Sequence, residues 1–418
     1  MSIGYACKTV GVFNADMKSC TLKNANDERL IELIGHNIES LNNIIDYNIE
    51  NDIMLFRISS DLVPFGSSEA NKVKWWEIFS EEISTIGRKI KISNMRVSVH
   101  PGQYTVLNST NEEVVKRAVD DLIYHARILD SLGLSKEHKL VLHIGGAYEN
   151  KKLSATRFME NYKLLDENIK NRLVIENDDK IYNIEEVIEI GSKLSIPVIF
   201  DNLHNEINPS PDKLSEKYWI EQCKTTWKKE DGIQKIHYSN QAENKRIGSH
   251  SDSISINEFM AFYDMLDRDD IDIMLEVKDK NLSCVKCINC ISTDLNINVL
   301  EKEWSRYKYS ILEHSHTSYL KIRELLKNKQ DVSAISFYNL LENGLNSQGD
   351  NGSFVNTALH VWGYFKDKAD EKEKVNFFKY LEKYKLNEVG INSVKAYLKK
   401  LAEKYDESYL LNSYYFIL

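Results

Sequence analysis

Short apolar runs alternate with amphipathic stretches along the first two thirds of the chain. Each run is bounded by polar residues, glycine or proline, as is typical of a buried strand, and the stretch after it is helical in character. A helix is predicted to begin at Asn26, for example, and its apolar stripe consists of Leu30, Leu33, Ile34 and Ile38. The predicted strands are residues 3–7, 53–58, 96–100, 139–144, 172–176, 197–201, 234–238 and 271–277.

Repeated strand–helix units of this kind predict an α/β protein with a parallel (β/α)8, or TIM, barrel. The residues at the ends of the predicted strands support this fold. In a TIM barrel, the active site is built at the C-terminal ends of the strands, and here six strands end at or near a metal-ligand type of side chain. These residues are His100, His143, Glu176, Asp201, His237 and Glu276.

The pattern changes after Glu276. Cys284, Cys287 and Cys290 lie in a polar segment, which predicts a loop, and from Val299 onward the chain is helical in character with no proline. We therefore expect a barrel domain over residues 1–282 and a smaller all-helical C-terminal domain over residues 296–418. The three cysteines could hold an iron–sulfur cluster or zinc, but no fourth ligand is evident, so a loop of free thiols is favoured.

Composition places the chain among ordinary globular proteins. It has 418 residues, of which 42% are hydrophobic and 28% charged. It contains no run of about 18 apolar residues, and its start lacks the pattern of a signal peptide, so we expect no membrane span and a cytoplasmic location. The net charge of -9 argues against a simple basic nucleic-acid binder, although bound divalent metals would reverse the sign locally.

Imidazole and carboxylate side chains together suit zinc, manganese or iron ions. The set is large enough for two or three metals, with Glu176 and Glu276 free to bridge them, and such a cluster suits phosphodiester hydrolysis. No glycine-rich phosphate loop or dinucleotide fingerprint occurs, so we expect no nucleotide cofactor. The candidate ligands are His100, His143, Glu176, Asp201, His204, His237, His250 and Glu276.

Other polar residues have two interpretations each. Strand alternation puts Lys235 on the same face as His237, pointing into the barrel mouth, but it could equally be a lysine paired with a barrel carboxylate. Gln103 and Tyr104 follow the strand that ends at His100, where they could stack on or wedge between bases, or simply pack a loop. Tyr5, at the end of the first strand, is ambiguous in the same way. The remaining histidines are interpreted as surface or hydrogen-bonded core residues: His36, His125, His138, His314, His316 and His360.

Taken together, these residues resemble the UV damage endonuclease family, whose barrel is related to that of endonuclease IV. The resemblance covers residues 3–280. The motifs that carry it are Gly4-Tyr5, Phe56-Arg-Ile58, Pro64-Phe65, His100-Pro-Gly-Gln-Tyr104, Leu142-His-Ile-Gly-Gly-Ala-Tyr148, Glu176-Asn-Asp178, Asp201-Asn-Leu-His204, Lys235-Ile-His237, His250 and Glu276-Val-Lys278.

The resemblance implies an enzyme that nicks UV-damaged double-stranded DNA immediately 5′ of cyclobutane pyrimidine dimers, 6-4 photoproducts and abasic sites, without ATP. It implies up to three divalent metals, with manganese favoured, on the ligands named above. We expect the protein to be a monomer. The implied catalytic residues are Glu176, Lys235, His237 and Glu276, with Lys235 in the position of a lysine that can be carboxylated. Gln103 and Tyr104 match the pair that probes the damaged strand, and Tyr5 matches a damage-contacting tyrosine.

The chain departs from the family pattern at positions near the lesion site. Thr9, Ser68 and Asn205 replace an asparagine and two histidines that the family often has, while every metal ligand is kept. Nicking is therefore expected to survive, with lesion range the property that changes. The helical region around residues 304–309 and 319–326 is similar to a small uncharacterised helical domain of some bacterial proteins, to which no activity is assigned.

Two other functions fit parts of the pattern. Sugar isomerases or epimerases also place histidines and carboxylates at barrel strand ends, although they need fewer metals and have no use for Gln103 and Tyr104. A non-catalytic DNA-damage-binding protein could use a structural metal and a helical partner-docking domain, although it would not need the full ligand set.

Overall fold

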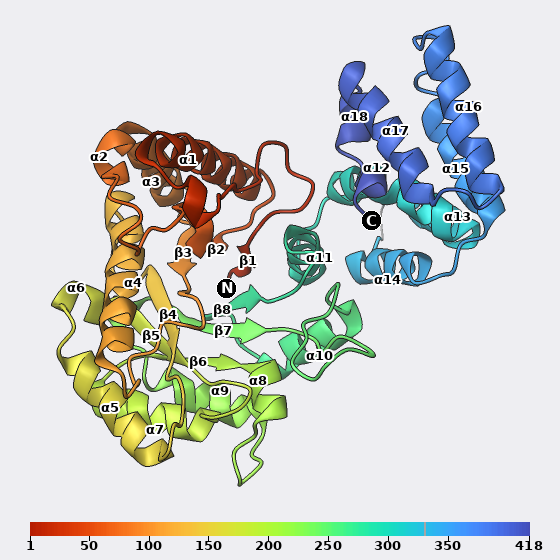
Figure 1. The fold of residues 1–418 in the computed structure, drawn as a ribbon. Coiled ribbons are helices and arrows are strands. Elements are labelled where there is room, and N and C mark those ends of the chain that lie inside the picture. The colour runs from red at the N-terminus through yellow and green to blue at the C-terminus, as the bar shows by residue number, and fades with distance from the viewer. Residues whose placement is uncertain (330–331) are drawn as a thin grey trace. The chain divides into compact units, whose positions relative to one another are not determined.

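The computed structural model describes residues 1–329 and 332–418 of the chain. Within them the strands pair in sequence order, all parallel, and β8 returns to β1, so the sheet closes into a barrel surrounded by helices (Figure 1). This confirms the predicted TIM barrel. The strands are β1 (Ile3–Cys7), β2 (Leu55–Ile58), β3 (Arg96–Val99), β4 (Lys139–His143), β5 (Leu173–Glu176), β6 (Val198–Asp201), β7 (Gln234–Tyr238) and β8 (Ile271–Leu275).

The strand register brings candidate ligands side by side. His143 on β4 pairs with Glu176 on β5, and Asp201 on β6 pairs with His237 on β7. Because parallel strands of a barrel point the same way, these side chains gather at one rim. The register, more than the sequence spacing, decides which ligands can share an ion.

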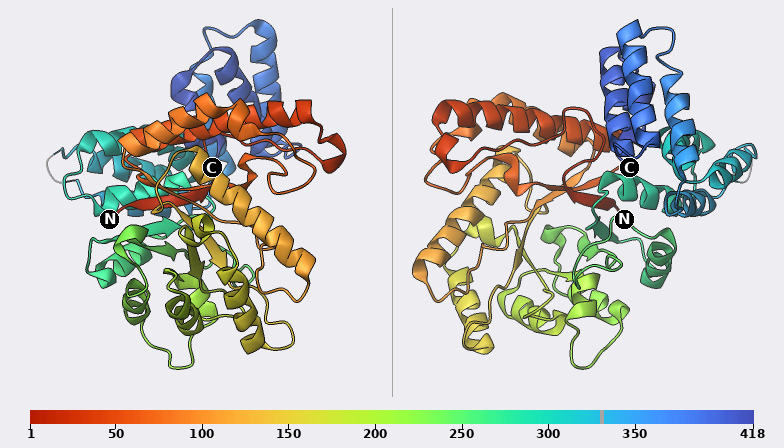
Figure 2. Two further views of the ribbon diagram at one scale, coloured as in Figure 1. Left: turned by 90° about the vertical axis from the view of Figure 1, so that its left-hand side faces the viewer. Right: turned by 45° about the vertical axis from the view of Figure 1, so that its right-hand side comes forward.

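Helices cover the outside of the barrel, as the further views in Figure 2 also show. Their starts follow sequence signals: the Asn26 side chain caps α1 by accepting a bond from the Arg29 N–H, and Asn183 forms a capping box with Glu186 at α7. The helices are α1 (Asp27–Glu50), α2 (Trp75–Ile78), α3 (Ser80–Ile92), α4 (Glu112–Ser131), α5 (Lys151–Lys163), α6 (Glu167–Lys170), α7 (Ile184–Leu194), α8 (Asn202–Ile207), α9 (Glu216–Lys224), α10 (Ile256–Leu266) and α11 (Asn281–Ile291), with 3-10 turns η1 (Leu22–Asn24), η2 (Ser60–Leu62) and η3 (Lys229–Asp231).

The cysteine segment is a helix, α11, and the predicted loop is wrong. Cys284 and Cys287 are both fully buried. Cysteine behaves as a small apolar residue when buried, so the spacing of three places these side chains on a packing face together with Leu282 and Val285. The Cys284 thiol lies 3.6 Å from the backbone oxygen of Ile3, its hydrogen-bond acceptor. Among residues 1–329 and 332–418, no candidate metal cluster contains a cysteine.

Paired charges fill the end of the barrel where the strands begin. Lys139 on β4 donates to Asp231 at 2.5 Å, and Arg96 on β3 lies 3.1 Å from Asp272 on β8. Burial lowers the pKa of Lys139, and the Asp231 carboxylate opposes that shift. Residues at this face of a TIM barrel serve stability, since the chemistry is at the other end.

The C-terminal helices have a core of their own. Trp362 stacks on Phe377 with ring centroids 4.4 Å apart, and Phe365, Leu398 and Tyr415 are fully buried around them. The helices are α12 (Ile297–His314), α13 (His316–Leu325), α14 (Ala334–Leu345), α15 (Asn351–Trp362), α16 (Glu371–Lys385), α17 (Ile391–Lys404) and α18 (Ser408–Leu411), followed by η4 (Tyr414–Phe416).

Internal contacts divide the chain into two compact units. The barrel unit comprises residues 1–254 and 261–288, and the helical unit comprises residues 255–260 and 289–418. None of the described helices combines the length and the apolar character needed to cross a membrane.

We predict that Asp231→Ala lowers the free energy of unfolding by about 3 kcal/mol, because it leaves the buried ammonium of Lys139 without its partner. Chemical denaturation monitored by tryptophan fluorescence measures this loss. The matched control is Asp270→Ala, which removes an exposed carboxylate that pairs with Arg268 and Lys224 at the surface and should cost less than about 1 kcal/mol. Equal losses in the two variants would contradict a stabilising role for the buried pair.

Candidate metal centre and active site

The predicted ligands come from the C-terminal ends of six strands. His143, Glu176 and Asp201 are the last residues of β4, β5 and β6, and His237 is the last but one of β7. His100 follows β3 directly and Glu276 follows β8 directly, so neither is part of a strand. The structure therefore brings all of them to the rim where TIM barrels carry their active sites.

Two ligand groups meet at Glu176. One consists of His100, His143 and Glu176, and the other of Glu176, Asp201, His237 and Glu276, with ligand atoms within 4.8 Å of one another in each group. The first group is spanned by His100 Nε2 and His143 Nε2, which lie 3.4 and 3.9 Å from Glu176 Oε2. In the second, His237 Nδ1 lies 2.8 Å from Glu176 Oε1 and 3.4 Å from Glu276 Oε1.

These spacings fit metal coordination. Ligand bonds of about 2.1 Å place the donor atoms around one ion about 3 to 4 Å apart. The distances of 3.4, 3.9 and 3.4 Å fall in this range, and the shorter one of 2.8 Å is a hydrogen bond between His237 and Glu176. Three buried atoms of the site also have no hydrogen-bond partner among the described residues, namely Asp201 Oδ2, His143 Nδ1 and Glu176 Oε2. Buried polar atoms are rarely left unsatisfied in native proteins, so the donor set is suited to a bound cation.

His204 and His250 lie at the edge of the cluster. His204 Nδ1 is 3.7 Å from Glu176 Oε1 and donates a hydrogen bond to the backbone oxygen of Asn177 at 2.9 Å. His250 Nδ1 is 3.8 Å from Glu276 Oε2, in a loop that forms an isolated bridge with Gln241. Both imidazoles are within reach of the site, but neither belongs to the two groups that converge on Glu176.

Glu176 is ionised in this environment. Burial disfavours its charged form, but His237 and His143 outweigh burial and hold the pKa of Glu176 well below its usual range. Burial in turn lowers the pKa of His237 to about 4, against the opposing attraction of Glu176. A neutral imidazole beside an ionised carboxylate is the protonation state that a metal ligand pair requires.

The pKa values of Asp201 and His204 are both raised, in contrast to those of Glu176 and His237. Burial raises the pKa of Asp201 to about 7, and the nearby carboxylates of Glu176 and Glu276 add to the shift. For His204, burial favours the neutral form, but Asp201 and Glu176 outweigh it and raise the pKa to about 9. Negative charge is therefore concentrated at this side of the cluster, where a cation would relieve the repulsion between carboxylates.

Arg57 is a site residue for which the sequence indicated no role. From β2, its Nη2 atom donates to Glu276 Oε1 at 2.5 Å and lies 3.1 Å from His237 Nε2. The guanidinium is buried, and its interaction with Glu276 favours the charged form. The signal that could have found it was a lone arginine inside an otherwise apolar strand, since a buried arginine needs an anionic partner.

Asn177 is a second residue of this kind. It follows Glu176, is completely buried, and exchanges two hydrogen bonds with the backbone of Asp201 at 2.9 and 3.1 Å. Its backbone oxygen is the partner of His204 Nδ1. One asparagine thus fixes the orientation of two predicted ligands on the neighbouring strand and helix.

Lys235 lies on β7 two residues before His237 and is buried, with 1% of its side chain exposed. Burial lowers its pKa well below the usual value, and the positive charges of Arg96 and Arg57 act in the same direction. The alternative of a paired lysine is not supported, because no ion pair joins Lys235 to a carboxylate within residues 1–329 and 332–418.

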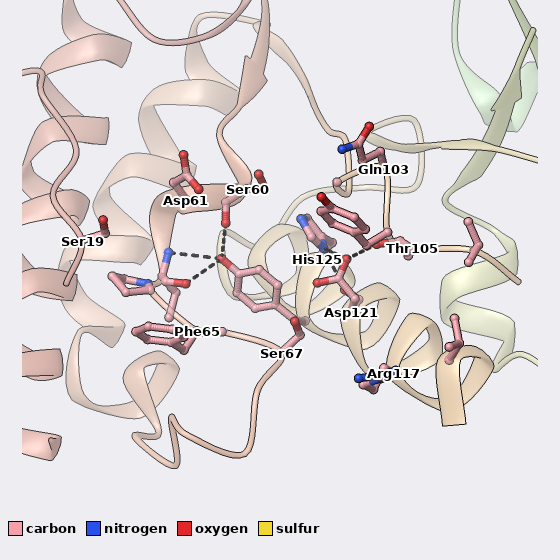
Figure 3. Close-up of a pocket in the computed structure, with 18 of the residues that line it drawn as sticks. Ser19, Ser60, Asp61, Phe65, Ser67, Gln103, Thr105, Arg117, Asp121 and His125 are labelled. Atoms are coloured by element: carbon pink, nitrogen blue, oxygen red, sulfur yellow. Dashed lines mark hydrogen bonds and ion pairs between the residues drawn. The ribbon is translucent and has the colours of Figure 1, made fainter. Parts of the chain in front are cut away.

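Gln103 and Tyr104 lie on the loop after β3, beside a cleft of about 790 Å³ (Figure 3). Tyr104 is 84% exposed, so its ring is not used in packing the loop. The next residue anchors the loop: Thr105 Oγ1 donates to the Asp121 carboxylate on α4 at 2.6 Å. The loop is held at one end while the two predicted probe residues project toward solvent.

Tyr5 does not fit its predicted role. Its side chain is fully buried, and its hydroxyl lies 2.8 Å from Thr9 Oγ1 and donates to Asn48 Oδ1 at 2.8 Å. Because the hydroxyl is satisfied inside the barrel unit, Tyr5 cannot contact a DNA strand in this conformation. Its partner Thr9 is one of the positions where the sequence departs from the expected family pattern.

A closed parallel barrel whose strand ends gather histidines and carboxylates around one buried glutamate defines a TIM-barrel enzyme with a candidate metal centre. Comparison with known proteins makes the class specific. Residues 1–308 match the family described as UV-endonuclease UvdE, and the chain belongs to that family. It is thus an endonuclease of a family that acts on damaged DNA.

Individual relatives agree. The chain is 40% identical over 408 residues to the UV DNA damage endonuclease of Clostridium perfringens (strain 13 / Type A), covering 97% of this chain and 96% of that protein. It is 32% identical to the UV DNA damage endonuclease of Bacillus cereus (strain Q1), over 65% of this chain and 86% of that one. The crystal structure of SacUVDE superposes with a TM-score of 0.64 at 37% identity, covering 69% of this chain and 96% of that chain.

The C-terminal region has a separate match. Residues 308–418 match a family described as a protein of unknown function (DUF1722). The Clostridium perfringens relative is matched over nearly its whole length, so it shares this region, whereas the Bacillus cereus relative covers only 65% of the chain.

We predict that Asn177→Ala weakens metal binding about 10- to 100-fold, because the backbone of Asp201 loses the amide that orients it, while the contact of His204 with the backbone oxygen of residue 177 is kept. Calorimetric titration of the metal-free protein with Mn²⁺ measures the affinity. The control is Asn37→Ala, which removes an equally buried asparagine whose bonds go to the backbone of Lys18 and Leu62 away from the ligands. If both variants bound Mn²⁺ like the parent protein, Asn177 would have no orienting role.

Proposed function

We propose that this chain nicks duplex DNA immediately 5′ of UV photoproducts, namely cyclobutane pyrimidine dimers and 6-4 photoproducts, and of abasic sites, to start excision repair. The reaction would use two or three divalent ions, Mn²⁺ above all, and no ATP. The observation that carries the proposal is the pair of ligand groups sharing Glu176 at the mouth of a barrel of the UV-endonuclease family.

The ligand set supports hydrolysis of a phosphodiester. Divalent ions, when bound, supply an activated water and stabilise charge on the attacked phosphate and the leaving oxygen. Glu176, which belongs to both ligand groups, would be the first bridging carboxylate. Glu276, oriented by a hydrogen bond from Arg57, would be the second. The proposed metal ligands are His100, His143, Glu176, Asp201, His204, His237, His250 and Glu276.

The catalytic residues we propose are Glu176, Lys235, His237 and Glu276. Glu176, His237 and Glu276 are buried or nearly buried at the rim, and Lys235 is buried two residues before His237 on β7, so electrostatic effects on the phosphate would be strengthened. The family resemblance puts Lys235 in the position of a lysine that can be carboxylated. A mass increase of one CO2 on the peptide that contains Lys235 would identify that modification.

Lesion recognition would depend on Gln103 and Tyr104. An exposed tyrosine beside an amide, on a loop anchored by Thr105 and Asp121, can enter a base stack that damage has weakened. The adjoining cleft, which reaches from this loop to Phe65 and Arg117, has room for a displaced base. We further propose that the protein acts in the cytoplasm as a monomer, with the activity in residues 1–282 and a separate helical domain over 296–418.

The decisive experiment incubates the purified protein with Mn²⁺ and an end-labelled duplex that carries one thymine dimer. A single cut directly 5′ of the dimer, abolished by EDTA and independent of ATP, is the expected result. Equal cutting of the undamaged duplex would contradict lesion specificity. Absence of cutting by protein with bound metal would contradict the proposed reaction, and a test for sugar epimerisation would then follow.

We predict that Glu176→Gln lowers the nicking rate more than about 100-fold, because both ligand groups lose their shared carboxylate. Metal content measured by mass spectrometry should fall in parallel. Glu185→Gln, on the outer helix α7, is the control and should nick like the parent. Full activity of Glu176→Gln with its metals retained would refute the bridging role.

We predict that Tyr104→Ala lowers the ratio of nicking on damaged to undamaged duplex about tenfold, since one stacking contact with a base is lost. Metal content should not change. Tyr218→Ala removes another exposed tyrosine, on α9, and should leave the ratio intact. An unchanged ratio in Tyr104→Ala would show that this ring has no part in recognition.

A further inference from the structure

The helical unit carries a surface on which aromatic rings and basic side chains alternate. We call it the aromatic–basic patch. Its members come from α12, α13, the turn after α15, and α18, so segments far apart in sequence build one surface. The patch consists of Trp304, Lys308, Tyr319, Arg323, Tyr364 and Tyr409.

Ring contacts join the aromatic residues of the patch into two groups. Trp304 and Tyr319 have centroids 5.4 Å apart, and Tyr364 and Tyr409 stack at 5.9 Å with an interplanar angle of 12°. The buried ring of Tyr309 lies beneath, 6.5 Å from Tyr409 and 6.4 Å from Tyr364. Each of the patch rings keeps part of its surface exposed, and Tyr409 is 37% exposed.

The two cations of the patch are placed over these rings. The Lys308 ammonium is 4.8 Å from the centroid of Tyr309 and 5.9 Å from that of Tyr409, and the Arg323 guanidinium is 5.6 Å from that of Tyr319. Cation–π contacts hold both side chains at the surface of these rings. Burial lowers the pKa of Lys308, and the positive charge of Arg323 adds to this shift, so the two cations are close enough to repel each other.

No carboxylate compensates them. Within residues 289–329 and 332–418, neither Lys308 nor Arg323 forms an ion pair or hydrogen bond with an acidic side chain. Two acidic residues that neighbour members of the patch in sequence form ion pairs with other lysines. Glu324, next to Arg323, pairs with Lys327, and Glu407, two residues before Tyr409, pairs with Lys368. By contrast, the more deeply placed basic residue Lys395 of the same unit is paired, with Glu313.

We propose that the aromatic–basic patch binds single-stranded DNA, as a second nucleic-acid site separate from the metal centre. Unpaired bases stack on exposed aromatic faces, and the phosphates between them pair with lysine and arginine. A duplex would use the cations but not the rings, because its bases are already stacked. Two uncompensated cations over a row of ring faces therefore fit an unpaired strand better than any other occupant. An acidic peptide is the competing occupant, and it would need the cations alone.

The inference does not require the proposed nicking reaction. The test uses the full-length chain in EDTA and a fluorescent, undamaged oligothymidine of about a dozen nucleotides, with binding measured by anisotropy at several salt concentrations. Failure of nicking and failure of this inference are therefore distinguishable.

The charge variant is Lys308→Gln combined with Arg323→Gln. Affinity should fall at least about tenfold, and the slope of log affinity against log salt should decrease by about 1.4, because two phosphate contacts are lost. Lys379→Gln combined with Lys399→Gln removes two exposed lysines of α16 and α17 and is the matched control. Equal affinities and slopes in the two double variants would overturn the proposal.

The ring variant is Tyr409→Ala, for which we expect about a tenfold loss of affinity from one base stack. Tyr380→Ala is its control, since Tyr380 has the same 37% exposure on α16 outside the patch. Thermal unfolding verifies that both variants are folded. Loss of binding in the charge variant but none in Tyr409→Ala, together with full competition by polyglutamate, would overturn the single-strand proposal in favour of an acidic peptide.

Discussion

The structure depends above all on the burial of one carboxylate. Glu176 is 1% exposed and lies against His143 on β4, His237 on β7 and His100, which directly follows β3. A buried carboxylate is tolerable only where partners compensate its charge, so the barrel must close with the correct register before the site is stable. At the other end of the barrel, buried charges are compensated by ion pairs within the protein, such as that of Lys139 with Asp231, and these pairs serve stability.

The sequence was most informative where local patterns and the site coincide. Alternation of apolar strands and amphipathic helices predicted the barrel, and strand ends predicted residues that the structure gathers, such as His143 and Asp201. Arg57 was missed because its partner Glu276 is 219 positions away, a pairing that only barrel closure creates. The same holds for Asn177, whose function lies in hydrogen bonds to the next strand.

Two predictions failed for reasons of packing. The polar composition around Cys284 indicated a loop, yet buried cysteine acts as a small apolar residue and the segment forms a helix. Tyr5 was expected to contact damaged DNA, but bonds to Thr9 and Asn48 hold it inside. In both cases the deciding contacts come from other parts of the fold, and no local pattern encodes them. The aromatic–basic patch also depends on contacts that no local pattern encodes, since folding alone brings Lys308 and Tyr409 together.

The distribution of ligands over the strands also has a consequence for synthesis of the protein. Glu176 is made a hundred residues before Glu276, and its partner His237 lies between them. A nascent chain on the ribosome can therefore hold part of the donor set, but the second ligand group is complete only after the last barrel strand has emerged. The candidate centre of this endonuclease is therefore incomplete throughout translation of the barrel, and its donor set can be completed only when the ring of strands closes.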